Sequence, residues 1–210
     1  MDKLDPAKLY YIDGSPFARL CRILIDEWQL PVQEVEIPFP LSDDFFKINP
    51  MGQVPVLETI GEMIFPTAQI VEQLWAMTVE PTEPYLDPLA DRQLLSTLIG
   101  MGDFMVTANQ QVWAGLEPSG EDILGFNPGE RHQERVYRCL DWMEARAQHW
   151  LTGDEPNVCD YALACFLFWS DSRRPIEWRN RTKLASIVDR LRDRPSFMAT
   201  IPEPWSSLSK

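Results

Sequence analysis

Two short segments carry residue types that could bind a ligand through hydroxyl and backbone groups. In the first, residues 49–57 (Asn-Pro-Met-Gly-Gln-Val-Pro-Val-Leu), two prolines bracket a glycine, and the second proline precedes an apolar run. Proline has no N–H for a sheet ladder, so Pro55 is expected at the first residue of a strand, at an edge or at a bulge. Because cis peptide bonds occur almost only before proline, Val54–Pro55 is a candidate cis bond, which would turn the backbone groups of Val54 into a cleft. The alternative is an ordinary turn before a strand.

The second segment is Asp13-Gly14-Ser15-Pro16, a turn that leads from a short strand at 9–12 into a helix. Ser15 suits the N-cap position, and Pro16 suits the first helical position. The helix is predicted from one apolar face with a period of 3.6 residues, which consists of Phe17, Leu20, Cys21, Leu24, Ile25 and Trp28. The segment therefore places a hydroxyl group at a helix N-terminus, directly after a strand.

The elements that would position these two segments form an α/β half. Short strands are predicted at 9–12, 32–37, 54–58 and 63–65, and helices after Pro16, at 43–48 and after Pro66. A strand–helix–strand start implies a parallel pair with a right-handed crossover, and the turn at 60–62 adds an antiparallel hairpin. This order predicts a thioredoxin-like domain over residues 1–79.

A helical half follows. Residues 80–88 are rich in proline and acid, which predicts a linker, and no strand pattern recurs over 89–210. Helices are predicted at 89–114, at 131–151, from Asn157, and over a last segment that ends at Arg194-Pro195. The helix from Asn157 is apolar all round, so we expect it at the centre of an all-helical domain. Asn157 and Asp160 form a capping-box-like pair, which favours a structural role over a functional one.

Composition and charge exclude several classes of function. The 210 residues are 45% apolar, which suits one large or two small globular domains, and the net charge of −13 argues against partners such as nucleic acid and anionic membranes. The four cysteines have neither metal-ligand nor redox-pair spacing, so we expect small buried hydrophobic residues and no metal site. The sequence has no apolar leader and no run long enough to span a membrane, so we expect a reduced, cytoplasmic protein.

Four motifs in order resemble the cytosolic glutathione transferases, and the resemblance covers almost the whole chain. Residues 10–19 are similar to the bacterial, serine-type run in which two aromatic residues and a turn precede Ser-Pro-Phe-Ala-Arg. Residues 49–55 resemble the family's Asn-Pro-x-Gly-x-Val-Pro, whose last proline is cis. Residues 157–163 resemble its buried-helix capping motif, and residues 194–197 (Arg-Pro-Ser-Phe) resemble a tail common in bacterial members. The resemblance implies a thioredoxin-like domain followed by a helical bundle domain, glutathione as co-substrate and a homodimer.

The resemblance also assigns roles to individual residues. The backbone of Val54 would pair with the cysteinyl part of glutathione like an added strand. A thiol has a pKa of about 8.5, so it is mostly protonated at neutral pH, whereas the thiolate is the nucleophile. Ser15 could donate a hydrogen bond to the bound sulfur and lower the pKa of the thiol, with help from the helix dipole. Tyr11, at the end of the first strand, is the rival donor. The glutathione-binding set that the resemblance implies is Phe17, Gln53, Val54, Pro55, Pro66 and Thr67.

Two departures from the relatives bear on the chemistry. Omega-type relatives carry Cys-Pro-Phe-Ala where this chain has Ser-Pro-Phe-Ala at 15–18, so a mixed disulfide with glutathione cannot form there. Most relatives begin the helix after the hairpin with Glu-Ser or Asp-Ser, which holds the γ-glutamyl carboxylate, whereas this chain has Pro66-Thr67. Thr67 can replace the serine, but the acid is lost. Asp103 stands where some relatives offer an acid to the γ-glutamyl amine across a dimer, although a solvated helix residue is the simpler interpretation.

The predicted function is that of a glutathione transferase that adds the glutathione thiolate to a small hydrophobic electrophile in detoxification, or reduces an organic peroxide with it. Tyr11, Met101, Met105 and Trp113 are the candidates for contact with the electrophile. The alternative is a non-catalytic member that binds a partner or a different thiol, which the loss of the acid at Pro66 motivates. A dehalogenase or isomerase on the same fold would differ only in its substrate.

Overall fold

The computed structural model describes residues 7–79, 88–115, 125 and 127–203. These residues divide into two compact units. The first contains the described residues up to 79 together with 193–203, and the second contains those from 88 to 192. The sequence-based boundaries instead assigned everything after residue 88 to the helical domain, and the predicted linker lies outside the described residues except for Pro88.

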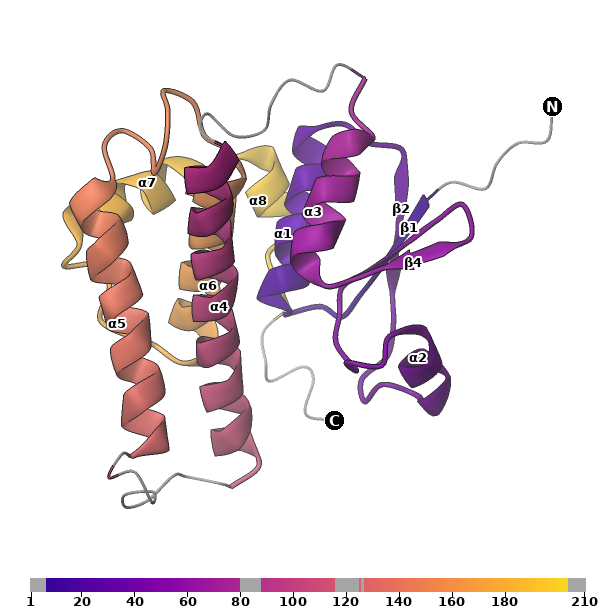
Figure 1. Ribbon diagram of the computed structural model, residues 1–210, viewed down its shortest axis with the longest axis horizontal. Helices are drawn as coiled ribbons and strands as arrows, with labels where there is room; N and C mark the ends of the chain where they lie inside the picture. The colour runs from indigo at the N-terminus through magenta and orange to yellow at the C-terminus, as the bar shows by residue number, and fades with distance from the viewer. Residues whose placement is uncertain (1–6, 80–87, 116–124, 126, 204–210) are drawn as a thin grey trace. The chain divides into compact units, whose positions relative to one another are not determined.

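The first unit contains a four-stranded sheet with the thioredoxin-like order of elements that the sequence predicts. Helices α1 and α3 cover one face of the sheet (Figure 1). The sheet order is β2-β1-β3-β4, in which β1 pairs with β2 in parallel and with β3 antiparallel, and β4 closes an antiparallel hairpin. The elements are β1 (Ala7–Tyr11), α1 (Pro16–Glu27), β2 (Val32–Glu36), α2 (Asp43–Ile48), β3 (Val56–Thr59), β4 (Glu62–Ile64) and α3 (Thr67–Ala76).

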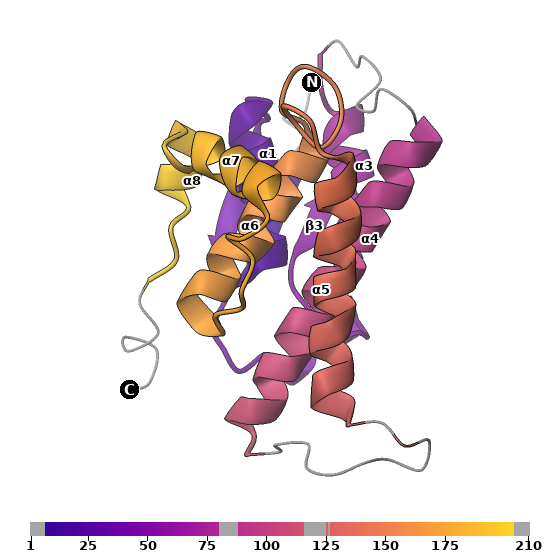
Figure 2. The same cartoon turned by 90° about the vertical axis from the view of Figure 1, so that its left-hand side faces the viewer.

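A short C-terminal helix completes the first unit. Helix α8 (Pro195–Ala199) was predicted only as a tail motif, but it packs against α1 (Figure 2). Ser196 and Phe197 are both buried there. The contact links residues about 170 positions apart in the chain, such as Ser196 and Glu27, which explains why local sequence patterns did not reveal it.

The second unit consists of helices α4 (Pro88–Trp113), α5 (Pro128–Arg146), α6 (Val158–Arg173) and α7 (Thr182–Arg192). Helix α4 packs on α5 and α6, and α7 packs on α6 (Figure 2). As predicted, α6 is the central helix: nearly every residue from Val158 to Ser170 is buried. None of the helices in the described ranges combines the length and the apolar character that crossing a membrane requires.

Helix α5 ends earlier than the prediction of residue 151. Ala147 leaves the helical conformation with a ψ of 138°, although it is fully buried. Trp150 and Leu151 continue the apolar pattern outside the helix, and the N–H of Leu151 donates to Asp160 Oδ1 at 2.8 Å. The periodicity therefore reported burial correctly, but not the point at which the chain turns toward α6.

Three of the four cysteines match the prediction of small buried residues. Cys21, Cys159 and Cys165 are buried, whereas Cys139 on α5 is only half-buried, so that prediction was wrong for this residue. The apolar side of α5 is narrower than that of α6, and Cys139 sits at its border between Arg138 and the buried Leu140.

Candidate functional site

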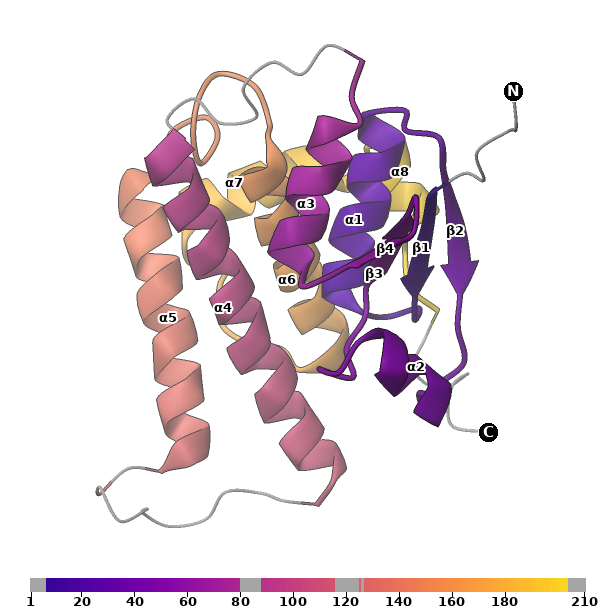
Figure 3. The same cartoon turned by 45° about the vertical axis from the view of Figure 1, so that its right-hand side comes forward.

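The strand register brings three chain segments to one end of the sheet in the first unit. Tyr10 of β1 lies opposite Val56 of β3, and Leu57 of β3 lies opposite Ile64 of β4. The C-terminal end of β1, the N-terminal end of β3 and the C-terminal end of β4 therefore share one end of the sheet, where α1 and α3 also begin (Figure 3). Ser15 and Val54 lie between elements at this end, and Thr67 is the first residue of α3 there.

Ser15 is the N-cap of α1, as predicted, and its Oγ accepts a hydrogen bond from the N–H of Ala18 at 3.3 Å. The backbone carbonyl of Ser15 accepts from the N–H of Arg19 at 2.9 Å, so the first turn of the helix is fixed. Within the part of the chain that the structure describes, no group accepts the hydroxyl hydrogen of Ser15. The residue is half-buried, and its hydroxyl can still donate a hydrogen bond to a ligand.

The loop before β3 is held by Asn49, which is 1% exposed. Its Nδ2 donates to the carbonyl of Gln53 at 2.7 Å, and its Oδ1 accepts from the N–H of Met51 at 3.0 Å. Gly52 has a φ of +61°, and a Cβ at this position would lie 3.0 Å from the ring of Phe46, so a glycine is required. These contacts set the course of the backbone into Val54.

Val54 presents its backbone to the end of the sheet. The Val54–Pro55 peptide is cis, which confirms the sequence prediction, and regular pairing of β3 begins only at Val56. Among the described residues, neither the N–H nor the C=O of Val54 has a hydrogen-bond partner. Because unpaired backbone groups next to a strand can pair with an added extended segment, Val54 can bind a peptide-like ligand in this way.

Helix α3 begins at the same end of the sheet with a pair of open N–H groups. Pro66 is its N-cap residue and has no capping side chain, and the Phe65–Pro66 peptide is also cis. The first bonds of the helix run from Gln69 and Ile70 to the carbonyl of Pro66. In the described structure, the N–H groups of Thr67 and Ala68 and the hydroxyl of Thr67 have no acceptor or donor partner. Such a helix N-terminus is a natural site for an anion.

The two tyrosines of β1 differ in what their hydroxyls contact. The Tyr10 hydroxyl donates to Glu58 Oε2 at 2.5 Å, and this hydrogen bond, together with burial, raises the pKa of Tyr10 to about 12. Arg22 lies over the ring of Tyr11, 4.3 Å from its centroid. Burial raises the pKa of Tyr11 and Arg22 partly opposes the increase, so this phenol is protonated at neutral pH. Tyr11 therefore keeps a proton that it could donate.

Helix α8 holds α1 at two places, one at the last residue of α1 and one at the end of its first turn. Arg194 and Ser196 both bond the carboxylate of Glu27, the last residue of α1. Arg19, at the end of the first turn of α1, donates to the carbonyl of Phe197 at 3.0 Å and lies over the Phe197 ring. The sequence marked residues 194–197 as a family tail without a role. The structure shows that they hold the helix that carries Ser15.

Both residues of the capping pair at the start of α6 form hydrogen bonds within the fold. Asp160 accepts from the N–H of Asn157 at 3.0 Å and from that of Leu151, while the Oδ1 of Asn157 accepts from the N–H of Cys159 at 2.9 Å. The carboxyl group is fully buried, and desolvation raises the pKa of Asp160 to about 6 against the opposing effect of these hydrogen bonds. The predicted structural role of this pair agrees with these contacts.

The remaining candidates lie in the second unit. Met105 is 5% exposed and lines a cavity between helices of that unit, while Trp113, the last residue of α4, is 47% exposed. Met101 is fully buried in the core. Asp103 is exposed and has no cation partner among the described residues. The contact of any of these residues with an electrophile stays a prediction.

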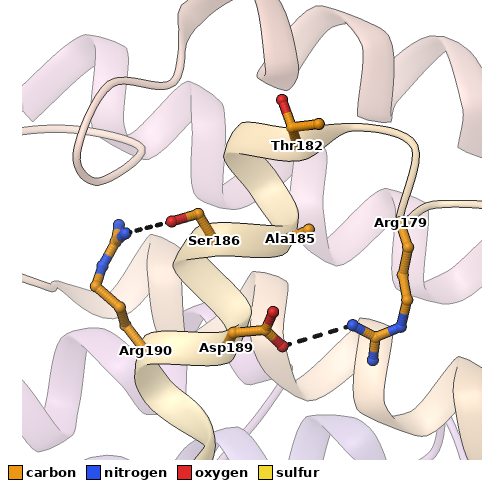
Figure 4. Close-up of a pocket in the computed structure, with 6 residues that line it drawn as sticks. All are labelled: Arg179, Thr182, Ala185, Ser186, Asp189 and Arg190. Atoms are coloured by element: carbon orange, nitrogen blue, oxygen red, sulfur yellow. Dashed lines mark hydrogen bonds and ion pairs between the residues drawn. The ribbon is translucent and has the colours of Figure 1, made fainter.

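An open groove on α7 has a volume of about 510 Å³, but the side chains that line it already bond to one another. Arg179 contacts Asp189 at 3.5 Å, and Arg190 donates to Ser186 Oγ at 2.7 Å (Figure 4). No group of three or more metal-ligating side chains occurs in the described ranges. The open donors at the end of the sheet are therefore the best candidate for a site.

Comparison with known proteins places the chain in a family. The family model for the N-terminal domain of glutathione S-transferases matches residues 9–81, and the model for their C-terminal domain matches residues 129–195. The uncharacterized GST-like protein YibF of Escherichia coli (strain K12) is 30% identical over 197 residues, which are 90% of this chain and 95% of that protein. The chain belongs to the glutathione S-transferase family.

Solved structures are similar over most of the chain. A glutathione S-transferase of Methylobacillus flagellatus KT with glutathione bound superposes with a TM-score of 0.80 at 27% identity, covering 93% of this chain and 99% of that one. A glutathione S-transferase of Methylobacterium radiotolerans JCM 2831 in complex with glutathione sulfonate superposes with a TM-score of 0.78 at 26% identity, covering 93% and 94%. A thioredoxin-like domain followed by a helical domain is thus the fold of this chain.

Proposed function

We propose that this protein is a serine-type glutathione transferase that adds the thiolate of glutathione to a small hydrophobic electrophile. The observation that carries the proposal is the set of unpaired donors at one end of the sheet: the hydroxyl of Ser15, the backbone of Val54 and the first N–H groups of α3. Family membership and the glutathione bound in a similar bacterial structure support it.

In the proposed complex, each open group takes one part of the tripeptide. The backbone of Val54 pairs with the cysteinyl residue, and the N–H groups of Thr67 and Ala68 receive the γ-glutamyl carboxylate. Gln53, whose side chain is exposed, and Phe17, in the first turn of α1, border the ligand. The hydroxyl of Ser15 donates to the sulfur and favours the thiolate, because a hydrogen bond to the charged form lowers the pKa.

Ser15 acts here as a hydrogen-bond donor and not as a nucleophile, because no base stands ready to remove its proton among the contacts of the described residues. The helix dipole of α1 adds a favourable potential at the same point. The thiolate then attacks the electrophile: a bond forms between the sulfur and the electrophilic carbon, the bond from that carbon to the leaving group breaks, and the leaving group departs with the electron pair. Tyr11, with its protonated phenol, stands as a wall of the site or as a second donor.

Replacing Ser15 with Ala tests the proposal. We expect turnover to fall at least about tenfold, because a hydrogen bond to a charged group contributes about 1.5–3 kcal/mol. Ser42→Ala is the matched control: Ser42 caps α2 and accepts from the N–H of Phe45, also at 3.3 Å, so it tests the loss of a cap alone. The pKa of bound glutathione, followed by thiolate absorbance, should rise only in the Ser15 variant. Unchanged turnover would remove Ser15 from the mechanism.

The second candidate function is a non-catalytic protein that binds a different ligand at the same groups. It is favoured by Pro66, which removes one N–H and the acid that relatives place there. Calorimetry separates the two candidates: a ligand at 100 times its Kd should add about 2.7 kcal/mol to the free energy of unfolding. No heat and no shift in melting temperature at about 10 mM glutathione would favour the second candidate.

We further propose that the protein is a homodimer and acts in detoxification. This proposal draws support from the resemblance of the whole chain to cytosolic transferases, and Asp103 would then offer its exposed carboxylate across the dimer to a γ-glutamyl amine. Light scattering tests the dimer directly. A monomer at micromolar concentration would remove this role from Asp103 while leaving the roles of Ser15 and Val54 unaffected.

A further inference from the structure

The second unit contains a partly open cavity, and none of its described lining residues belongs to the set proposed to bind glutathione. It lies among α4, α5, the end of α6 and the residues that follow α6, and has a volume of about 160 Å³. Met105, Val136 and Trp169 form apolar walls, and each of them is almost fully buried. An apolar cavity of roughly this size in a protein core can take up benzene, so this one has room for a ligand with a single ring.

Two nitrogen-bearing side chains line the same cavity. Arg174 donates through Nη1 to the carbonyl of Ala108 at 3.0 Å, and in the described part of the chain its guanidinium has no carboxylate partner. The Nδ1 atom of His132 is buried and also lacks a hydrogen-bond partner there. Because a buried polar atom without a partner is costly, His132 Nδ1 would gain from a polar ligand, and the remaining N–H groups of Arg174 can donate to a ligand that accepts hydrogen bonds.

The charged side chain among the described lining residues is the cation Arg174, although the chain as a whole carries −13. Burial, followed by Arg135 and Arg131, lowers the pKa of His132, so the imidazole is neutral at pH 7. The ring of His132 lies against Phe104, with centroids 5.5 Å apart, which holds the imidazole in place. Among the residues that the structure describes, no acidic side chain lines the cavity. The free edge of the Arg174 guanidinium therefore suits a carboxylate.

We propose that the cavity binds a small one-ring carboxylate, with the ring against Met105, Val136 and Trp169 and the carboxylate toward Arg174 and His132. This site goes beyond the proposed glutathione-binding groups of the first unit, because every described residue that lines it belongs to the second unit; of the candidates for contact with the electrophile, it contains Met105. Binding should need no glutathione.

The experiment uses benzoate as the probe, with the full chain in the absence of glutathione. Calorimetry and ligand-observed NMR are expected to detect binding at up to 10 mM benzoate. Acetate, which has the charge without the ring, and benzyl alcohol, which has the ring without the charge, should each bind at least tenfold more weakly. No benzoate binding, or equal binding of benzyl alcohol, would overturn the proposal.

Three variants locate the binding. Ala108→Leu fills the cavity and keeps the backbone carbonyl that accepts from Arg174, so it should abolish benzoate binding. Arg174→Gln should weaken binding at least tenfold. Arg138→Gln removes the same charge from an exposed position of α5, where Arg138 pairs only with Glu134 at 3.2 Å, and should leave benzoate affinity unchanged. Melting curves confirm that each variant is folded, and wild-type affinity in Ala108→Leu would show that benzoate binds elsewhere.

Discussion

Helices α1 and α6 both begin with a polar N-cap residue, yet the two helix starts use their polar groups differently. At α6, Asn157 and Asp160 satisfy one another's backbone, and Asp160 also accepts from Leu151. At α1, Ser15 accepts one bond from Ala18, and its hydroxyl hydrogen remains without an acceptor among the described residues. A cap motif alone therefore does not show whether its residues serve the fold or bind a ligand. The polar groups that remain unpaired after capping are the ones that can bind a ligand.

The largest loss in the free energy of unfolding is expected at the start of α6, where the capping groups already have hydrogen-bond partners. Asp160→Ala would leave two N–H groups, those of Leu151 and Asn157, without their acceptor in a buried setting. Each orphaned group costs about 1–3 kcal/mol, so the free energy of unfolding should fall by about 4 kcal/mol in urea titrations. Asp154→Ala, at an exposed position just before α6, should change it by less than about 0.5 kcal/mol. Equal effects of the two variants would contradict the comparison.

The same carboxyl group predicts a dependence of stability on pH. Its pKa is about 6 in the folded chain and 3.8 in the reference state, so the folded state binds the proton more tightly. The contribution of Asp160 is therefore fully present below about pH 4 and is lost as the pH rises through 6, by about 3 kcal/mol at 1.36 kcal/mol per pKa unit. Urea midpoints of the wild type and Asp160→Asn between pH 4 and 7 would measure it. A difference between them that stays constant with pH would refute this prediction.

The smallest effect on stability is expected at α1. Ser15→Ala should lower the free energy of unfolding by only about 1 kcal/mol, which is the ordinary cost of an N-cap, and Ser42→Ala by a similar amount. Thermal unfolding of both variants would sharpen the contrast with Asp160. A loss of several kcal/mol in Ser15→Ala alone would mean that Ser15, like Asp160, serves the fold first.

Local signals account for most of what the sequence predicted correctly. Ser15 and Pro16 indicate the start of a helix, and Pro55 indicates the start of β3, because caps and prolines act within three or four residues. The fold followed from the order of these elements. The end of α5 was missed because the apolar pattern continues past it to Trp150 and Leu151, and α8 was missed because its contacts, such as that of Phe197 with Arg19, join residues far apart in the chain.

The sequence named the candidate residues but not the hydrogen bonds around them. It placed Ser15 in a turn, Val54 at the start of a strand and Thr67 at the start of a helix. Their meeting at one end of the sheet depends on the register of β1, β3 and β4. Only the structure shows that the hydroxyl of Tyr10 donates to Glu58. The pairing of Arg174 with a backbone carbonyl, which leaves the rest of its guanidinium open, carries no sequence signal at all.

The contacts between α8 and α1 affect the order in which parts of the chain can fold during synthesis. Glu27 and Arg19 are synthesised early, but their partners at residues 194–200 follow only after the whole second unit has been translated. On a ribosome, the sheet of the first unit would form long before the contacts between α8 and α1, since N-terminal segments fold first during synthesis. The helix that carries Ser15 would therefore gain these contacts only when residues 194–200 emerge.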